Sequence, residues 1–194
     1  MFFSSIDNFN DIALIESTGK INTYLDLQQN VSDFSTFFTE KHLIFIIGDN
    51  DFSTIVCYLS ALESEIVPIL LGSRINQNQL NSLITAYKPK YIFQKLDLNT
   101  HQGFKQTSKY HEYSLFEREK YESITLHPDL ALLLTTSGST GSPKLVRLSK
   151  KNLISNAKSI SKYLKITSND RGITSLPFNY SYGLSVINSH LISG

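Results

Sequence analysis

The sequence predicts an α/β protein in which helices cover a largely parallel sheet. Short runs of β-branched residues alternate with amphipathic helical patterns over most of the first half of the chain. Two runs, Leu43–Ile47 and Leu130–Leu134, are apolar throughout, as strands covered on both faces are. Repeated strand–helix–strand order is typical of βαβ units, so we expect layered sheets and helices.

Composition indicates an ordinary globular chain. The 194 residues are 41% hydrophobic and 18% charged, which fits neither disorder nor a fibrous repeat. A chain of this length buries roughly 70% of its unfolded surface, enough for one core or two unequal subdomains. The net charge of +1 offers no basic field for nucleic acid or an anionic membrane.

The N-terminus, the lack of long apolar runs and the single cysteine argue against a signal peptide, a membrane span and a cysteine nucleophile. Residues 1–7 lack the basic start and long apolar stretch of a signal peptide. No later run approaches the roughly 20 apolar residues of a membrane helix, so we expect no membrane span and, by default, a cytoplasmic location. Cys57 lies in an apolar run, which favours a buried structural thiol over a nucleophile.

The first elements are predicted to be two short strands and a helix. Ile12–Ile15 and Ile21–Tyr24 have the composition of strands. The following apolar residues recur at i, i+4, i+7 and i+11 and form a single packing face: Leu27, Val31, Phe34 and Phe38.

A second strand–helix–strand unit follows. The apolar run at Leu43–Ile47 ends at Gly48, after which Asp49, Asn50 or Asp51 caps a helix over residues 52–64. The run over 66–71 is the returning strand. Pro68 has no N–H to donate, so it belongs at an edge or at a strand end.

The middle of the chain changes character. Leu80, Leu83, Ile84 and Tyr87 predict a third helix, and Tyr91–Phe93 a short strand. From residue 94 to about 121 the pattern becomes polar, which indicates loops with at most a brief strand near Tyr113–Phe116. We therefore divide the chain into a βαβ subdomain (1–100), connecting loops (101–129) and a third segment (130–194).

The third segment begins with Leu130–Leu134 as a strand and continues, after a Gly/Ser/Thr-rich stretch, with Leu145–Leu148 as another. Ser149 then caps a helix that ends near Leu164. Its predicted inward face consists of Leu153, Ala157, Ile160 and Leu164. A solvated face carries Lys151, Lys158, Lys162 and Lys165. We expect the apolar face of the last helix, over 184–194, to lack part of its packing partners.

The stretch Thr136–Lys144 reads TSGSTGSPK and has the chemistry of a phosphate-binding loop. Such loops combine backbone N–H groups, hydroxyl donors and a cation. Gly138 and Gly141 let the main chain approach an anion. The hydroxyl donors are Ser137, Ser139 and Thr140. Lys144 has two interpretations: it neutralises phosphate charge, or it pins the loop through a carboxylate. A flexible tether is the alternative for the whole stretch.

Two common phosphate motifs do not fit this stretch. The G-x-x-x-x-G-K-[ST] motif fails because the two glycines are only three residues apart and Pro143 precedes the lysine. The dinucleotide motif G-x-G-x-x-G fails because residue 140 is threonine. The sequence thus disfavours Walker-type NTPases and nicotinamide or flavin enzymes.

Instead, Thr136–Lys144 resembles the signature of the adenylate-forming (AMP-binding) superfamily, which includes acyl-CoA synthetases, nonribosomal peptide adenylation domains and luciferases. Thr23–Leu27, the Tyr58–Pro68 block, Asn152-Leu153 and Leu176–Leu184 are similar to other family blocks. The resemblance spans nearly the full chain. It implies the N-terminal part of that family's large domain, incomplete at its C-terminus.

The resemblance implies an ATP-dependent carboxylate ligase that uses Mg²⁺ and converts a carboxylic acid to acyl-AMP. The acyl group then passes to a thiol, either CoA or a carrier-protein phosphopantetheine. It implies that Thr136, Ser137, Gly138, Ser139, Thr140, Gly141 and Lys144 bind the ATP phosphates. The catalytic residue is unknown, because the family's adenylation lysine is expected beyond Gly194, and these residues alone are expected not to form acyl adenylate.

Three departures from the family pattern obscure the substrate: Leu145 replaces a usual glycine, Lys150 a frequent histidine, and Tyr180 a histidine common in acyl-CoA synthetases. Tyr180 and Tyr182 either line the acyl site or simply pack. The histidines show no metal-ligand spacing, so no protein metal site is predicted. An amino-acid-activating adenylation domain and a noncatalytic nucleotide-binding or interaction module remain alternatives.

Overall fold

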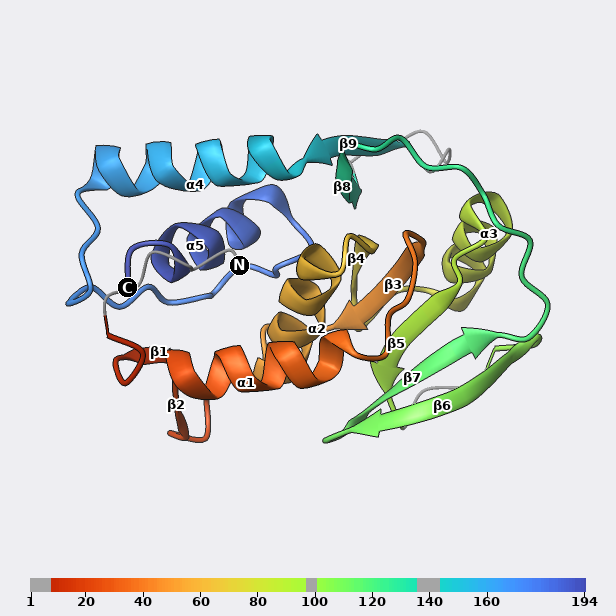
Figure 1. Ribbon diagram of the computed structural model, residues 1–194, viewed down its shortest axis with the longest axis horizontal. Coiled ribbons are helices and arrows are strands. Elements are labelled where there is room, and N and C mark those ends of the chain that lie inside the picture. The colour runs from red at the N-terminus through yellow and green to blue at the C-terminus, as the bar shows by residue number, and fades with distance from the viewer. Residues whose placement is uncertain (1–7, 97–100, 136–143) are drawn as a thin grey trace.

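The computed structural model describes residues 8–96, 101–135 and 144–194. Its described residues form a two-stranded sheet, a seven-stranded sheet and five helices (Figure 1). In chain order the elements are β1 (Ile12–Ile15), β2 (Ile21–Thr23), α1 (Tyr24–Ser35), β3 (Leu43–Gly48), α2 (Phe52–Glu63), β4 (Val67–Gly72), α3 (Gln77–Tyr87), β5 (Tyr91–Lys95), β6 (Phe104–Tyr110), β7 (Tyr113–Arg118), β8 (Leu130–Thr135), β9 (Leu145–Ser149), α4 (Lys150–Leu164) and α5 (Ser181–Leu191).

The large sheet has the order β6-β7-β5-β3-β4-β8-β9. Its four inner strands are parallel: β3 pairs with β4 and β5, and β4 pairs with β8. The outer strands β7, β6 and β9 run antiparallel to their neighbours. All residues of β3 are buried, as its continuous apolar run predicted. The carboxyl ends of β3, β4 and β8 therefore lie at one edge of the sheet.

Alternate residues along the strands separate two apolar cores, one on each face of the sheet. Ile44 and Ile46 of β3 belong to the core shared with α1, α2, α4 and α5. Phe45 and Ile47 belong to the core that α3 covers through Leu80 and Leu83. Figure 1 shows α3 apart from the other four helices, as this division requires. The sheet is thus covered on both faces.

Three helices begin at capping boxes. Thr23, Asp51 and Ser149 each accept from the backbone N–H three residues ahead, and each N3 side chain bonds back to the cap. These reciprocal bonds satisfy donors that the first helical turn leaves unpaired. The predicted cap Ser149 is confirmed, and Asp51 is the cap among the three candidates before α2.

The structure differs from the sequence-based expectations in three places. Residues 104–118 form the β6–β7 hairpin where mainly loops were predicted, although the expected short strand does lie within β7. Leu164, predicted to point inward, is 61% exposed because α4 ends there, beyond the edge of the core. The apolar face of α5 is covered: Leu184, Ile187 and Leu191 are buried in the core with α2 and α4.

Pro68 occupies the second position of β4, near a strand end as predicted. Its missing N–H costs little there, because the pairing of β4 with β8 involves only Ile69. The proposed division into subdomains remains a prediction. The single large sheet nevertheless takes strands from all three proposed segments.

Phe34 is the aromatic centre of the core beneath α1. Its ring makes edge contacts with Phe37, Phe38, Phe93 and Tyr110 at centroid distances of 5.2–5.8 Å. We predict that Phe34→Ala lowers the free energy of unfolding by about 3–5 kcal/mol, because it leaves a cavity in a closed core. Chemical denaturation measures the change. Phe37→Ala, at a side chain 41% exposed, is the matched control and should cost much less.

The pKa of the buried His42 side chain predicts how the free energy of unfolding changes with pH. Burial lowers the pKa of its imidazole, and the nearby Lys90 lowers it further. The unfolded chain therefore binds a proton near pH 6.5 that the folded chain takes up only at lower pH. We expect the free energy of unfolding to fall as the pH drops below about 6.5. Denaturation at several pH values should show that the free energy of unfolding depends less steeply on pH in His42→Gln than in the wild type. His127→Gln, at an exposed position, is the control and should keep the wild-type dependence. If His42→Gln also keeps the wild-type dependence, the prediction is wrong.

Candidate functional site

A pocket of about 510 Å³ lies at the carboxyl edge of the parallel strands. We call it the strand-end pocket. Its walls come from the ends of β3, β4 and β8 and from the segment before α5; they include Gly48, Gly72, Arg74, Thr135, Asn179 and Tyr180. Ligands of open α/β sheets bind at this edge, where loops leave the strands. The strand-end pocket is therefore the candidate functional site.

The strand that precedes the predicted phosphate loop, β8, ends at this pocket with Thr135. Its residues Thr136, Ser137, Gly138, Ser139, Thr140 and Gly141 lie outside the described residues. The two ends of the connection are described: Thr135 of β8 pairs with Leu145 of β9 in an antiparallel ladder. Lys144 is exposed and immediately precedes β9. The prediction that strands hold both ends of the loop is confirmed.

Tyr180 and Tyr182, the two aromatic residues considered for the acyl site, differ in their position relative to the pocket. Tyr180 lines the strand-end pocket and is 51% exposed. Tyr182 is 68% exposed and lies on the first turn of α5, outside the pocket lining. The structure thus brings Thr135, which precedes the loop, and Tyr180 to one pocket.

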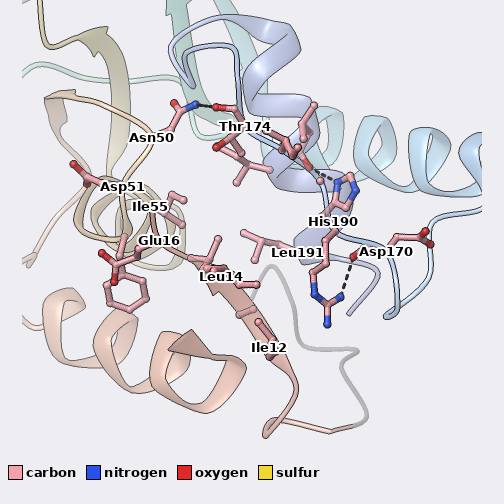
Figure 2. A pocket seen from close by; sticks show the side chains of 18 of the residues that line it. Ile12, Leu14, Glu16, Asn50, Asp51, Ile55, Asp170, Thr174, His190 and Leu191 are labelled. Carbon is pink, nitrogen blue, oxygen red and sulfur yellow. Dashed lines mark hydrogen bonds between the residues drawn. The ribbon is translucent and has the colours of Figure 1, made fainter. Parts of the chain in front are cut away.

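Asn50 fixes the segment that forms the pocket's far wall. Its Nδ2 donates to the carbonyl oxygens of Thr174 and Leu176, and its Oδ1 accepts from Phe178 N–H, each at 2.7 Å. Figure 2 shows the bond to Thr174. The sequence suggested Asn50 only as a possible helix cap. Its three bonds instead join the end of β3 to residues 174–178.

Two acidic side chains after β3 are already engaged. Asp49 accepts from Ser73 Oγ at 2.5 Å and forms a salt bridge with Lys95 at 3.3 Å. Asp51 accepts from the Tyr113 hydroxyl at 2.6 Å. Burial and the hydrogen bond to Asp51 raise the pKa of Tyr113, so its phenol stays protonated and serves as a donor. These carboxylates stabilise the strand ends.

Asn179 is the polar side chain of the pocket that sequence reasoning missed. Its residue is 9% exposed, and its Oδ1 is buried without a hydrogen-bond partner in the part of the chain that the structure describes. The amide lies against the backbone at Gly72, where an added Cβ would stand 3.6 Å from Oδ1. No sequence pattern marks this side chain, because its environment depends on a contact between distant segments.

A second pocket, of about 520 Å³, lies between β1, the start of α2, the segment 170–174 and α5 (Figure 2). His190 Nδ1 donates to the carbonyl of Val186 at 2.8 Å beside it, and Arg171 Nη1 donates to the carbonyl of Asp170 at 2.9 Å. None of the described residues predicted to form the site lines this pocket.

The described ranges hold neither a cluster of metal ligands nor a membrane-spanning helix. No group of three or more His, Cys, Asp or Glu side chains is arranged to hold a metal ion there. No helix within those ranges is both long and apolar enough to cross a membrane. Cys57 is fully buried in α2, and burial raises its pKa, as expected for a structural thiol.

Comparisons with known proteins agree with this architecture. The family model for AMP-binding enzymes matches residues 4–194. The Bacillus subtilis long-chain-fatty-acid–CoA ligase is 27% identical over 170 residues, which is 80% of this chain and 30% of that protein. This ligase and two chloroplastic relatives from Arabidopsis thaliana are far longer than this chain, which covers 22–30% of their length.

Solved structures share the fold. ATP-bound MatB from Rhodopseudomonas palustris superposes with a TM-score of 0.77 at 20% identity, over 99% of this chain and 42% of that one. The o-succinylbenzoate-CoA synthetase MenE from Bacillus subtilis, in complex with an acyl-adenylate intermediate, gives 0.78 at 20% identity, over 95% and 51%. This chain belongs to the AMP-binding enzyme family, and the predicted fold class is confirmed.

Gly183 allows α5 to sit against the wall of the pocket. A Cβ there would overlap the carbonyl oxygen of Pro177 and lie 2.6 Å from that of Leu176. Alanine normally stabilises a helix relative to glycine by about 1 kcal/mol. Here we expect the opposite: Gly183→Ala should lower the free energy of unfolding by about 1–3 kcal/mol, because backbone atoms cannot yield as side chains do. Thermal or chemical denaturation measures it.

Ser159→Ala, at an exposed position of α4, is the control for this substitution and should be nearly neutral. A Gly183→Ala variant as stable as the control would show that α5 and residues 176–177 do not approach each other as closely as described.

Proposed function

We propose that this chain is part of an ATP-dependent carboxylate ligase, which activates a carboxylic acid as acyl-AMP and transfers the acyl group to a thiol, CoA or a carrier-protein phosphopantetheine. The observation that carries the proposal is the family match over residues 4–194 together with the position of the TSGSTGSPK stretch. In sequence that stretch follows Thr135 of β8, which lines the strand-end pocket, and precedes β9.

In the first step a carboxylate oxygen of the acid attacks the α-phosphorus of ATP. A bond from phosphorus to the acid forms, the bond to pyrophosphate breaks, and acyl-AMP results. In the second step a thiolate attacks the acyl carbon and AMP leaves. The first step requires no nucleophile from the protein, because the carboxylate of the acid is the nucleophile, and the acyl adenylate that forms is electrophilic enough for direct attack by the thiolate.

The protein's contribution to the first step is charge compensation and alignment of two anions. We assign phosphate binding to Thr136, Ser137, Gly138, Ser139, Thr140, Gly141 and Lys144, through hydroxyl and backbone donors and one cation. Mg²⁺ would supply further positive charge on the ATP phosphates. ATP use is supported by the ATP-bound state of the structural neighbour MatB.

The complete activity belongs, in this proposal, to a longer polypeptide than residues 1–194. The relatives are several times the length of the matched region. The adenylation lysine that the resemblance implies has no counterpart assigned within this chain. A cytoplasmic location remains a prediction.

We predict that Lys144→Ala in the complete protein lowers kcat/KM for ATP–pyrophosphate exchange by about 10–100-fold, because it removes a charge-assisted contact to phosphate. Exchange is measured with a panel of fatty, aromatic and amino acids. Lys144→Arg should retain part of the activity. The control is Lys151→Ala, which removes an exposed lysine of α4.

Two results would count against these assignments. If the wild-type protein exchanges pyrophosphate with no acid in the panel, the ligase assignment fails. If Lys144→Ala matches wild type, the ligase assignment stands and the phosphate role of Lys144 fails.

A further inference from the structure

The carboxamide of Asn179 is an unused hydrogen-bonding group in the wall of a pocket. The residue is more than nine-tenths buried, and Oδ1 finds no donor within the described part of the chain. Buried polar atoms are almost always paired, so an unpaired acceptor on a residue that lines a pocket indicates a missing donor. The strand-end pocket is the space from which that donor can come.

The backbone on both sides of Asn179 is held in place. Phe178 N–H is held by Asn50 Oδ1 at 2.7 Å, and Tyr180 N–H donates to the Pro177 carbonyl at 3.1 Å. The tight fit of Gly183 against Leu176 and Pro177 fixes the same turn from the other side. A side chain that projects from such a fixed backbone has a defined starting position for recognition.

Charge in the pocket favours an anion. Arg74 lines the pocket, is exposed, and forms no salt bridge within the described residues. The carboxylate of Asp49, also in the lining, is offset by its salt bridge to Lys95. The guanidinium therefore leaves the pocket with an uncompensated positive charge.

We propose that the strand-end pocket takes the carboxylic acid substrate and that Asn179 selects an acid bearing a hydroxyl or N–H donor. This inference rests on the proposed ligase function. Arg74 offsets the charge of the ionised acid, and Tyr180 gives the carbon skeleton an aromatic wall. The volume of about 510 Å³ suits a small ligand.

The proposal distinguishes polar acids from plain fatty acids. A hydroxyl group can donate to Asn179 Oδ1 as it loses water, whereas a methylene leaves that oxygen buried and unpaired. Sites that hydrogen-bond a substrate reject analogues lacking the donor more strongly than apolar pockets reject an extra methylene. The pocket should therefore prefer 3-hydroxybutyrate and 3-aminobutyrate over butyrate.

The test is ATP–pyrophosphate exchange by the complete protein with these three acids. We expect kcat/KM for 3-hydroxybutyrate to exceed that for butyrate by about tenfold or more. Asn179→Leu should lower the value for 3-hydroxybutyrate by roughly tenfold, leave butyrate nearly unchanged, and leave KM for ATP unchanged. Asn169→Leu, at an exposed loop position, is the matched control.

A second variant keeps the test valid if Asn179→Leu does not fold, as judged by circular dichroism. Asn179→Asp replaces the neutral acceptor by a charged one and should raise the preference for 3-aminobutyrate over 3-hydroxybutyrate. The proposal is overturned if wild type prefers butyrate, if the leucine variant lowers both acids equally, or if the aspartate variant leaves the preference unchanged.

Failure of the ligase function is distinguishable from failure of this inference. In the first case wild type exchanges pyrophosphate with no acid at all. Saturation-transfer NMR then tests binding directly, without ATP. Binding of 3-hydroxybutyrate that is stronger than that of butyrate and is lost in Asn179→Leu supports the pocket assignment, and equal or absent binding overturns it.

Discussion

The parallel pairing of β3 with both β4 and β5 is the constraint on which the other features depend. All of β3 is buried, so its register is fixed by apolar packing on two faces. Because β4 also pairs in parallel with β8, the chain leaves three strands at a common edge. Gly48, Gly72 and Thr135 lie there and line the strand-end pocket.

The regular elements could be predicted wherever burial imposed a period on the sequence. The stripes of α1 and the apolar run of β3 are direct records of which side chains face a core. Within the β6–β7 hairpin, β6 has no such period, since most of it is exposed and it carries Lys105, Gln106 and Lys109. Backbone pairing of β7 with β5 and of β6 with β7 stabilises these strands, and pairing leaves little trace in side-chain polarity.

The candidate site could be predicted only in part, for a related reason. The groups expected to bind phosphate are adjacent in residues 136–144, so the sequence alone shows the glycines, hydroxyls and lysine together. The pocket is not local: Gly72 and Asn179 come from distant segments, and the segment before Asn179 is held by the hydrogen bonds of Asn50 to backbone atoms of residues 174–178. The identity of an asparagine does not reveal whether it caps a helix, holds a loop through hydrogen bonds or lines a pocket.

The pairing of Thr135 with Leu145 has a consequence for the energetics of anion capture. Bringing the ends of a chain segment together has an entropic cost that grows with the length of the segment. Here the β8–β9 ladder meets that cost when the protein folds. In the proposed function, the free energy of nucleotide binding is therefore not spent on bringing Thr135 and Leu145 together.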